Sequence, residues 1–542
     1  MNNRTNLTLW GLVLLFAVLM SIPWLVPHAG AVALVGFLPL LFAEAIATHT
    51  KTRHFWVMHY SAFVLWNAFT TFWVCNATVG GGIFAVLANA FQMSVVFGLF
   101  RLARKRMGGV VPYIFLAAAW IAWEHFYFDA QISWPWLVLG NAFAGTTGLV
   151  QWYEWTGVLG GSLWIWLVNL GIFGMVMAFG NGLMHSWNKI ARISSAAALT
   201  LVIAGPVATS LVLYHSYEEK SEASLDVVIG QPNFDPYHKF ESMTQAEQTE
   251  VLLGLYEKEL STFADKDRPV LLIAPETFTS DVVLNDVPAS RTIQTFKAFL
   301  GSHPQAEILF GASAYETFST RSAPHILAFE WGNGWLESRN SAIILDPSGD
   351  YEIYHKSKLV VGTELTPYPK LFVPLDNAIG KMLGQKGPLM GRCIGQDKAA
   401  ALHFRESVAI GCAVCYESVY GDFCRDYVKD GARLMTVITN DAWWGDTPGY
   451  RQHFNYSRLR AIELRRDLAR CGNTGISAII DQRGDVVKAG PWWEPYVMKG
   501  IVNLNSEQTF FVRHGDITGR VCSLIFLLLL ALTLVRLFLP KK

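Results

Sequence analysis

Three polar residues follow or interrupt apolar segments of this chain, and their side chains suit acyl-transfer chemistry. Glu276 follows the apolar run Val270-Leu-Leu-Ile-Ala-Pro, and Cys415 follows Val408-Ala-Ile-Gly-Cys-Ala-Val, whereas Lys356 lies in a charged segment between them. A thiolate is a nucleophile, a carboxylate is a base, and an ammonium group stabilises an oxyanion. Strand ends in α/β layers are common places for catalytic groups. We therefore interpret these three residues as candidate catalytic groups.

Each of the three has an ordinary explanation when it is taken alone. A glutamate after a strand is usually a cap or a salt-bridge partner, and a lysine in a charged loop is usually solvated surface. A cysteine at the end of an apolar strand is usually a small buried hydrophobe. The hypothesis therefore depends on the three residues together.

Cys412 and Cys415 form a C-x-x-C, a spacing found in redox pairs and zinc sites. In a continuous strand, however, positions i and i+3 point to opposite faces. No second C-x-x-C and no histidine pair with ligand spacing is present in the sequence. We predict no metal and no cofactor, and we assign Cys412 to packing and Cys415 to function. Pairing among Cys393, Cys424 and Cys471 stays open.

The composition indicates that part of the chain lies in a membrane. Of the 542 residues, 52% are hydrophobic and only 16% are charged, whereas soluble domains carry about 25% charged residues. The formal net charge is zero, so nothing indicates a nucleic-acid partner. Apolar blocks of about 20 residues, the length that spans a bilayer core, predict seven transmembrane helices near 9–26, 30–48, 55–75, 82–104, 111–128, 160–181 and 194–214. A final apolar run, 523–535, predicts an eighth.

Basic residues give these spans an orientation. With the N-terminus in the cytoplasm, the inner loops and tail receive Arg4, Lys51, Arg53, Arg101, Arg104, Lys105, Arg106, Lys189, Arg192, Arg536, Lys541 and Lys542, and the short outer loops receive no Lys or Arg. This predicts that both termini are cytoplasmic and that the polar region between spans seven and eight lies outside.

Three regions follow from these patterns. We expect a seven-helix transmembrane region at 1–219, an extracytoplasmic catalytic domain at 220–510 with short Val/Ile/Leu strands alternating with helices, and a C-terminal transmembrane helix with a short tail at 511–542. The outer segment 129–159 is rich in aromatic residues. We interpret it as an interfacial aromatic belt, with substrate gating as the alternative.

The order Glu, Lys, Cys and the flanking residues resemble the nitrilase superfamily, and nearly the whole chain resembles its membrane branch, the apolipoprotein N-acyltransferases. The matching segments are Gln231-Pro-Asn233, Asn340-Ser341 before a strand, Cys415-Tyr-Glu417, Asn440-Asp-Ala-Trp-Trp-Gly445, Gln452-His453, Arg458-Leu-Arg-Ala-Ile-Glu463 and Asn473-Thr-Gly475. Two departures are the loop Val361-Gly362-Thr363, where the family has Pro-Phe-Gly, and Phe240, where it has tryptophan. Lys358 competes with Lys356, but the spacing to Glu364 in the family pattern favours Lys356.

The resemblance implies an α/β nitrilase-type αββα sandwich and a reaction. A fatty acyl chain would move from a phospholipid donor to the α-amino group of a diacylglyceryl-modified N-terminal cysteine of an apolipoprotein, through a thioester on Cys415. Glu276 would be the base, and Lys356 with a backbone N–H near Tyr416 would stabilise the oxyanion. The resemblance further implies supporting or substrate-binding roles for Glu364, Tyr416, Glu417 and Trp443. The enzyme would act as a monomer in the cytoplasmic (inner) membrane, with the catalytic domain periplasmic.

Two alternatives remain at this point. A membrane-anchored nitrilase-type amide hydrolase would use the same triad with water as the acceptor, although eight spans are excessive for an anchor. A non-enzymatic lipid- or lipoprotein-binding membrane protein would need no reactive thiol. Few ionisable residues lie within the predicted spans, which disfavours a transporter.

Overall fold

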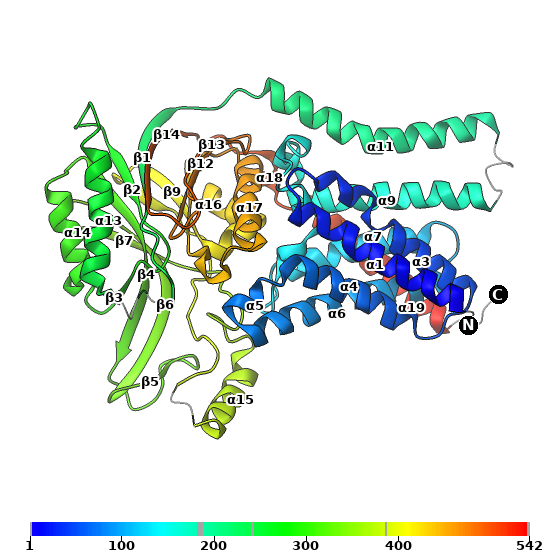
Figure 1. The fold of residues 1–542 in the computed structure, drawn as a ribbon, viewed down its shortest axis with the longest axis horizontal. Coiled ribbons are helices and arrows are strands. Elements are labelled where there is room, and N and C mark those ends of the chain that lie inside the picture. The colour runs from blue at the N-terminus through cyan, green and yellow to red at the C-terminus, as the bar shows by residue number, and fades with distance from the viewer. Residues whose placement is uncertain (1–2, 182–187, 238, 240–242, 385–386, 539–542) are drawn as a thin grey trace.

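The computed structural model describes residues 3–181, 188–237, 239, 243–384 and 387–538, and it divides into a helical bundle and an α/β domain (Figure 1). The helices of the bundle side are α1 (Asn3–Leu25), α2 (Ala33–Gly36), α3 (Leu38–His49), α4 (Phe55–Thr71), α5 (Val74–Ala77), α6 (Val79–Arg106), α7 (Val111–Tyr127), α8 (Tyr153–Thr156), α9 (Val158–Gly180), α11 (Lys189–Ser216), α18 (Phe510–His514) and α19 (Ile517–Phe538).

Helices cover the eight expected spans. Six segments of the described residues are long and apolar enough to cross a membrane: 3–25, 30–49, 79–106, 158–180, 189–216 and 517–538. The other two expected spans coincide with α4 and α7, which have 17 residues each. At 1.5 Å per residue such a helix rises about 26 Å, less than the ~30 Å of a bilayer core. Six spans are thus supported directly, and the eight-span arrangement stays a prediction.

The α/β domain contains two sheets. The strands are β1 (Ala223–Gln231), β2 (Val270–Ile273), β3 (Thr279–Val283), β4 (Ala306–Phe318), β5 (Phe329–Trp331), β6 (Gly334–Leu345), β7 (Tyr351–His355), β8 (Leu402–Phe404), β9 (Val408–Val414), β10 (Leu434–Thr439), β11 (Leu468–Gly472), β12 (Ala478–Ile480), β13 (Val486–Ala489) and β14 (Tyr496–Leu504). An eight-stranded sheet has the order β14-β1-β2-β4-β6-β5, with β3 on β4 and β7 on β6, and a six-stranded sheet has the order β13-β12-β11-β10-β9-β8.

The two sheets pack face to face between helices. Helices α13 (Gln245–Leu260) and α14 (Arg291–Gly301) cover the eight-stranded sheet, while α16 (Gly421–Lys429) and α17 (Pro448–Leu464) cover the six-stranded one (Figure 1). One buried apolar cluster joins the facing sides of β1, β2, β9, β10 and β11. Strands β1, β2 and β4 run parallel to one another, and so do β9, β10 and β11. Parallel strands bring their carboxyl ends to one edge, which is where the candidate residues were expected.

Helix α17 joins the α/β domain to the bundle. The indole N–H of Trp24 donates to Tyr456 Oη at 3.0 Å, and Tyr456 Oη donates to the carbonyl oxygen of Trp136 at 2.7 Å. The indole N–H of Trp136 donates to Gln452 Oε1 at 2.6 Å. Trp136 is fully buried. The aromatic-belt interpretation of segment 129–159 is therefore wrong for this residue, because it packs between the two halves of the protein rather than at a lipid interface.

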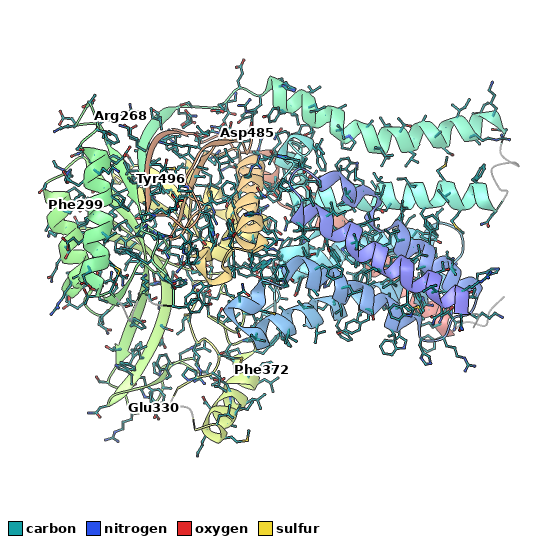
Figure 2. The ribbon with its side chains drawn as sticks, viewed as in Figure 1. Arg268, Phe299, Glu330, Phe372, Asp485 and Tyr496 are labelled. Atoms are coloured by element: carbon teal, nitrogen blue, oxygen red, sulfur yellow. The ribbon has the colours of Figure 1, made fainter. Side chains whose placement is uncertain are left out.

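Helix α15 (Pro369–Met382) carries apolar side chains on its exposed surface. Leu371, Leu375 and Met382, which are spaced as on one helix face, are all exposed. Figure 2 shows Phe372 of this helix and Glu330 of β5 at the periphery of the α/β domain.

Candidate active site

Glu276 is held where the parallel strand β2 ends. The strand stops at Ile273, and Ala274 and Pro275 lead to the carboxylate. Gly311 of β4 lies directly behind it, because a Cβ at Gly311 would be 2.5 Å from Glu276 Cα. The backbone N–H of Gly311 donates to Pro275 O at 3.1 Å. A glycine is thus required for the close approach that positions Glu276.

Lys356 lies between two carboxylates. Its Nζ is 3.0 Å from Glu276 Oε1 and 2.9 Å from Glu364 Oε2. The amide of Asn340 donates to Glu276 Oε1 at 2.8 Å and to Glu364 Oε1 at 2.7 Å, so it links the same two carboxylates. Burial disfavours the ammonium ion, but the two glutamates outweigh it and hold the pKa of Lys356 well above its usual range. The site therefore keeps a buried cation beside Glu276.

Cys415 is the first residue after β9 and opens a 3₁₀ turn, Cys415–Val419. Its φ of 52° is in the left-handed region, an unusual conformation for a side chain of this size. Burial and the charge of Glu276 raise the pKa of its thiol well above the ordinary value, while Lys356 acts in the opposite direction. The structure thus brings Glu276, Lys356 and Cys415 together, and the thiol needs a base to become a thiolate.

Glu417 fastens the turn of Cys415 to the segment that carries Lys356. Its Oε1 accepts from Tyr354 Oη at 2.6 Å and from the N–H of Ser357 at 2.6 Å. Its Oε2 accepts from the N–H of Val414 at 2.8 Å and from Tyr427 Oη at 3.1 Å. The carboxylate is fully buried. Glu417 therefore positions Cys415 and Lys356 relative to each other.

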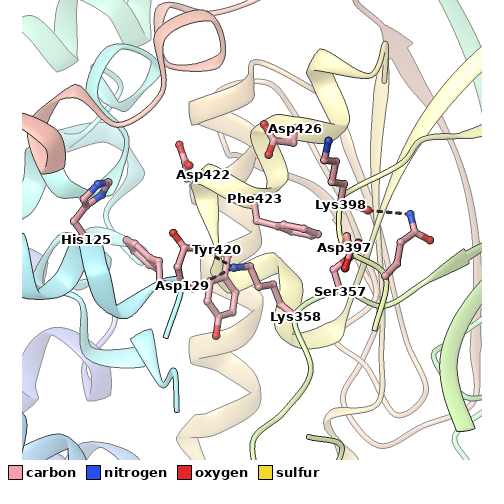
Figure 3. Close-up of a pocket in the computed structure, with 12 residues that line it drawn as sticks. His125, Asp129, Ser357, Lys358, Asp397, Lys398, Tyr420, Asp422, Phe423 and Asp426 are labelled. Atoms are coloured by element: carbon pink, nitrogen blue, oxygen red, sulfur yellow. Dashed lines mark hydrogen bonds and ion pairs between the residues drawn. The ribbon is translucent and has the colours of Figure 1, made fainter. Parts of the chain in front are cut away.

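Lys358, the competitor of Lys356, points elsewhere. Its Nζ is 3.0 Å from Asp129 Oδ1 and 3.2 Å from the carbonyl oxygen of Phe128, after the end of α7. Figure 3 shows it beside Tyr420 in a polar cavity of about 260 Å³ between the bundle and the α/β domain. Lys358 links the two halves of the protein, and Lys356 is the lysine at Glu276.

One group of side chains in the described residues has the composition of a metal site. Cys415 Sγ, a carboxylate oxygen of Asp441 and a ring nitrogen of His453 all lie within 4.8 Å of one another. Both oxygens of Asp441 are already engaged, one by His453 at 2.9 Å and the other by Arg470 at 2.5 Å. A cation here would face the guanidinium of Arg470, so this donor set does not fit a metal.

Comparison with known proteins assigns the chain to a family. The family model described as the apolipoprotein N-acyltransferase N-terminal domain matches residues 10–171, and the model described as carbon-nitrogen hydrolase matches residues 323–510. A protein named apolipoprotein N-acyltransferase from Chlorobaculum tepidum is 27% identical over 512 residues, which cover 92% of this chain and 91% of that protein. The chain belongs to the apolipoprotein N-acyltransferase family.

One further relative and one solved structure are also similar to this chain. The protein named apolipoprotein N-acyltransferase from Geobacter metallireducens is 28% identical over 521 residues, covering 94% of this chain and 92% of that one. Among solved structures, Nit3 of Saccharomyces cerevisiae, a member of the nitrilase superfamily, has 12% identity and a TM-score of 0.37 and covers 56% of this chain and 97% of its own. Family membership and the six apolar helices indicate an inner-membrane protein with a nitrilase-type α/β domain.

The supporting residues predicted for this family member divide into two groups. Glu364 and Glu417 contact the site as described above, whereas Tyr416 and Trp443 point away from it. Tyr416 Oη donates to the carbonyl oxygen of Ser133 in the segment before α8, at 2.9 Å. Trp443 is exposed and its ring packs on Tyr237 at 5.3 Å. Phe240 lies outside the described residues.

The structure also answers one question about cysteine pairing that the sequence left open, and it corrects one strand limit. All seven cysteines are unpaired, including Cys393, Cys424 and Cys471. Asn340 and Ser341 lie inside β6 rather than before a strand. The strand begins earlier because its first half pairs with the long strand β4.

Asn340 and His453 are functional candidates that the sequence did not single out. Both occur in the segments that carry the family resemblance, which is the only signal in the sequence that marks them. Their partners, Glu276 for Asn340 and the backbone of Cys415 for His453, come from distant parts of the chain.

Proposed function

We propose that this protein is an apolipoprotein N-acyltransferase, which moves a fatty acyl chain from a phospholipid to the α-amino group of the diacylglyceryl-modified N-terminal cysteine of a lipoprotein. This is the last step of lipoprotein maturation. The observation that carries the proposal is a buried Glu276–Lys356 pair acting on the thiol of Cys415, in an α/β domain that contacts apolar helices.

The first half-reaction acylates Cys415. Glu276 takes the thiol proton, and the thiolate attacks the ester carbonyl carbon of the phospholipid. The ammonium of Lys356, with a backbone N–H near Tyr416, stabilises the resulting oxyanion. When the C–O ester bond breaks, Glu276 gives its proton to the lysophospholipid alkoxide, and a thioester remains on Cys415.

The second half-reaction forms the amide. The α-amino group of the acceptor attacks the thioester carbonyl, and Glu276 removes a proton from the nitrogen as the C–S bond breaks. The thiolate of Cys415 leaves and is reprotonated, so the enzyme returns to its starting state. Glu364 and Asn340 keep Lys356 and Glu276 in the same relative positions through both steps.

A thioester survives only where water is kept away. Cys415 is 9% exposed, which supports a screened intermediate. Both substrates reside in the bilayer, so a site close to apolar helices shortens their search. The exposed apolar side chains of α15, including Leu371 and Leu375, and the Trp443–Trp444 turn suit contact with lipid at the entrance.

The proposed topology has eight spans. Region 1–219 crosses seven times, domain 220–510 lies on the periplasmic side, and region 511–542 returns the chain to the cytoplasm. The proposal is supported by the basic residues, which gather on the inner side and are absent from the short outer loops. The protein would act as a monomer with no nucleic-acid partner.

The test is to incubate the purified chain in lipid nanodiscs with phospholipid and a diacylated peptide that has a free N-terminal cysteine. We expect N-acylated peptide and lysophospholipid in equal amounts. Release of free fatty acid without N-acylation would favour the amide-hydrolase class of enzyme instead. Binding of both lipids with no turnover would favour a non-enzymatic lipid- or lipoprotein-binding protein.

A further inference from the structure

An apolar groove of about 410 Å³ opens between helices α9 and α11. Figure 1 shows α11 on the opposite side of the molecule from α15. Among the described residues that line the groove, none is charged and none belongs to the α/β domain that carries Cys415. The groove is therefore separate from the active site. Its apolar walls include Leu163 and Leu167 of α9 and Leu201, Val202 and Pro206 of α11.

Pro206 determines where α11 contacts α9. A proline inside a helix has no N–H to donate to the carbonyl oxygen four residues earlier, which here is that of Val202. The indole N–H of Trp164 on α9 donates to this carbonyl oxygen at 2.8 Å. A carbonyl freed within a bilayer needs such a partner, because no water is present to supply one. The groove thus lies beside a specific contact between the two helices.

The groove lies in the half of the membrane nearer the α/β domain. Both helices are among the six segments that are long and apolar enough to cross a membrane. Pro206 comes ten residues before the end of α11 at Ser216, a rise of about 15 Å. Leu167 comes nine residues after the start of α9 at Val158, about 14 Å. In the proposed topology this half is the periplasmic leaflet, the side on which the catalytic domain lies.

Hydrocarbon is the filling that suits a groove of this kind at this depth. Only 6% of the residues in the most apolar window of α11 are buried, so the groove can be reached from the surrounding lipid. Water would need two to four polar partners, which apolar walls do not offer. An empty groove would lose the dispersion contacts of every side chain that lines it. A volume of about 410 Å³ is also within the range of small-molecule sites.

Three neutral hydrogen-bond donors complete the lining. They are the indole N–H of Trp155 and the hydroxyl groups of Thr209 and Thr518. Within the described part of the chain, none of the three side chains donates a hydrogen bond to another residue. The ester oxygens that join an acyl chain to its glycerol can only accept. This part of the lining therefore suits the ester end of a lipid chain, without selecting the charge of a head group.

We propose that the groove between α9 and α11 is a second lipid site, which holds one acyl chain of a bilayer phospholipid together with its ester group. This lipid is not a substrate, because the groove shares no residue with the α/β domain. It fills the space beside α11, the helix that continues into β1, and so stabilises the connection between the bundle and the catalytic domain. The inference goes beyond the proposed function and does not depend on acyl transfer.

The test is native mass spectrometry of the full chain, released into mild detergent from nanodiscs of equal parts phosphatidylethanolamine and phosphatidylglycerol. A Cys415→Ser background prevents thioester formation. We expect a phospholipid of either head group to stay bound through a detergent wash. Leu167→Trp places a larger side chain in the groove and should reduce retention at least about tenfold, the loss expected when two CH₂ groups can no longer be buried. Leu211→Trp is the matched control, because Leu211 is exposed and lies nine residues after Val202, on the opposite face of α11.

A phospholipid held at the active site would remain in both tryptophan variants, so the difference between them is decisive. Equal retention by Leu167→Trp and Leu211→Trp, or loss of all lipid from the parent chain, would overturn the inference. If Leu167→Trp does not fold, a phospholipid with a photoreactive diazirine in its acyl chain replaces it. After the same wash we expect cross-links on the peptides that contain Leu163 and Leu201, and cross-links confined to other peptides would overturn the inference. A wild-type chain that retains this lipid but never forms a thioester would reject the proposed function and leave the lipid site standing.

Discussion

Glu417→Gln tests the positioning of the triad most sharply, because the substitution keeps the shape of the side chain. Both oxygens of Glu417 accept from backbone N–H groups: Oε1 from Ser357 at 2.6 Å and from Lys358 at 3.2 Å, and Oε2 from Val414 at 2.8 Å. The hydroxyls of Tyr354 and Tyr427 can rotate to accept from a new amide group. The backbone N–H groups cannot. Whichever way the amide lies, its NH₂ faces at least one of these backbone donors.

The expected loss follows from that conflict. A hydrogen bond to a charged group contributes about 1.5–3 kcal/mol, and a buried donor left unpaired costs about 1–3 kcal/mol. We expect the free energy of unfolding to fall by about 3 kcal/mol, or roughly 6 °C in the melting temperature of a domain of this size. Displacement of Lys356 from Cys415 by about 1 Å would slow acylation about 100-fold.

The assay measures the rate of acyl-adduct formation on Cys415 with phospholipid, together with thermal unfolding in the same detergent. Glu250→Gln, on the exposed face of α13, is the matched control and should behave as wild type. A Glu417→Gln chain that acylates at the wild-type rate would refute the reasoning. A lower melting temperature with an unchanged acylation rate would show that Glu417 stabilises the fold without positioning the site.

Three further predictions concern neighbouring residues. Gly311→Ala places a methyl group against Glu276 and should slow adduct formation about 100-fold. A normal rate would mean that β4 shifts to accommodate the methyl group without displacing Glu276. Lys356→Ala should abolish measurable acylation, whereas Lys358→Ala, which keeps the ammonium at Glu276, should lower it less than about tenfold; equal losses would contradict the assignment. Burial alone would raise the pKa of Asp441, but His453 and Arg470 outweigh it and lower the pKa from 3.8 to about 2. Ionised Asp441 therefore adds about 2 kcal/mol to the free energy of unfolding. This contribution is complete above pH 3.8 and disappears as the pH falls through about 2. The Asp441→Asn variant should not show this loss of stability during acid unfolding. An acid unfolding profile identical to that of the wild type would contradict the prediction.

The strands that end before Glu276 and Cys415 were easier to predict than the partners that surround these two residues. Glu276 and Cys415 follow short strands of uninterrupted apolar residues, a local signal that survives in the fold. The family resemblance marked Glu364, and the spacing to Glu364 favoured Lys356 over Lys358. The partner of Glu417 across the site, by contrast, is a backbone N–H that no sequence pattern marks.

The remaining differences have physical causes. Tyr416 is adjacent to Cys415 in sequence, but the 3₁₀ turn directs its hydroxyl to Ser133 in the bundle. Hydropathy located α4 and α7 but could not fix where each helix ends. Trp136 was read as interfacial because composition does not distinguish a tryptophan facing lipid from one buried between two parts of a chain.

The central claim is that Cys415 carries an acyl group. The most direct measurement is intact-protein and peptide mass spectrometry after the purified chain has been incubated with phospholipid alone. We predict a hydroxylamine-sensitive fatty acyl adduct on the peptide that contains Cys415, absent from Cys415→Ser. A folded wild-type chain that binds phospholipid but never carries this adduct, or carries it on another residue, would contradict the account.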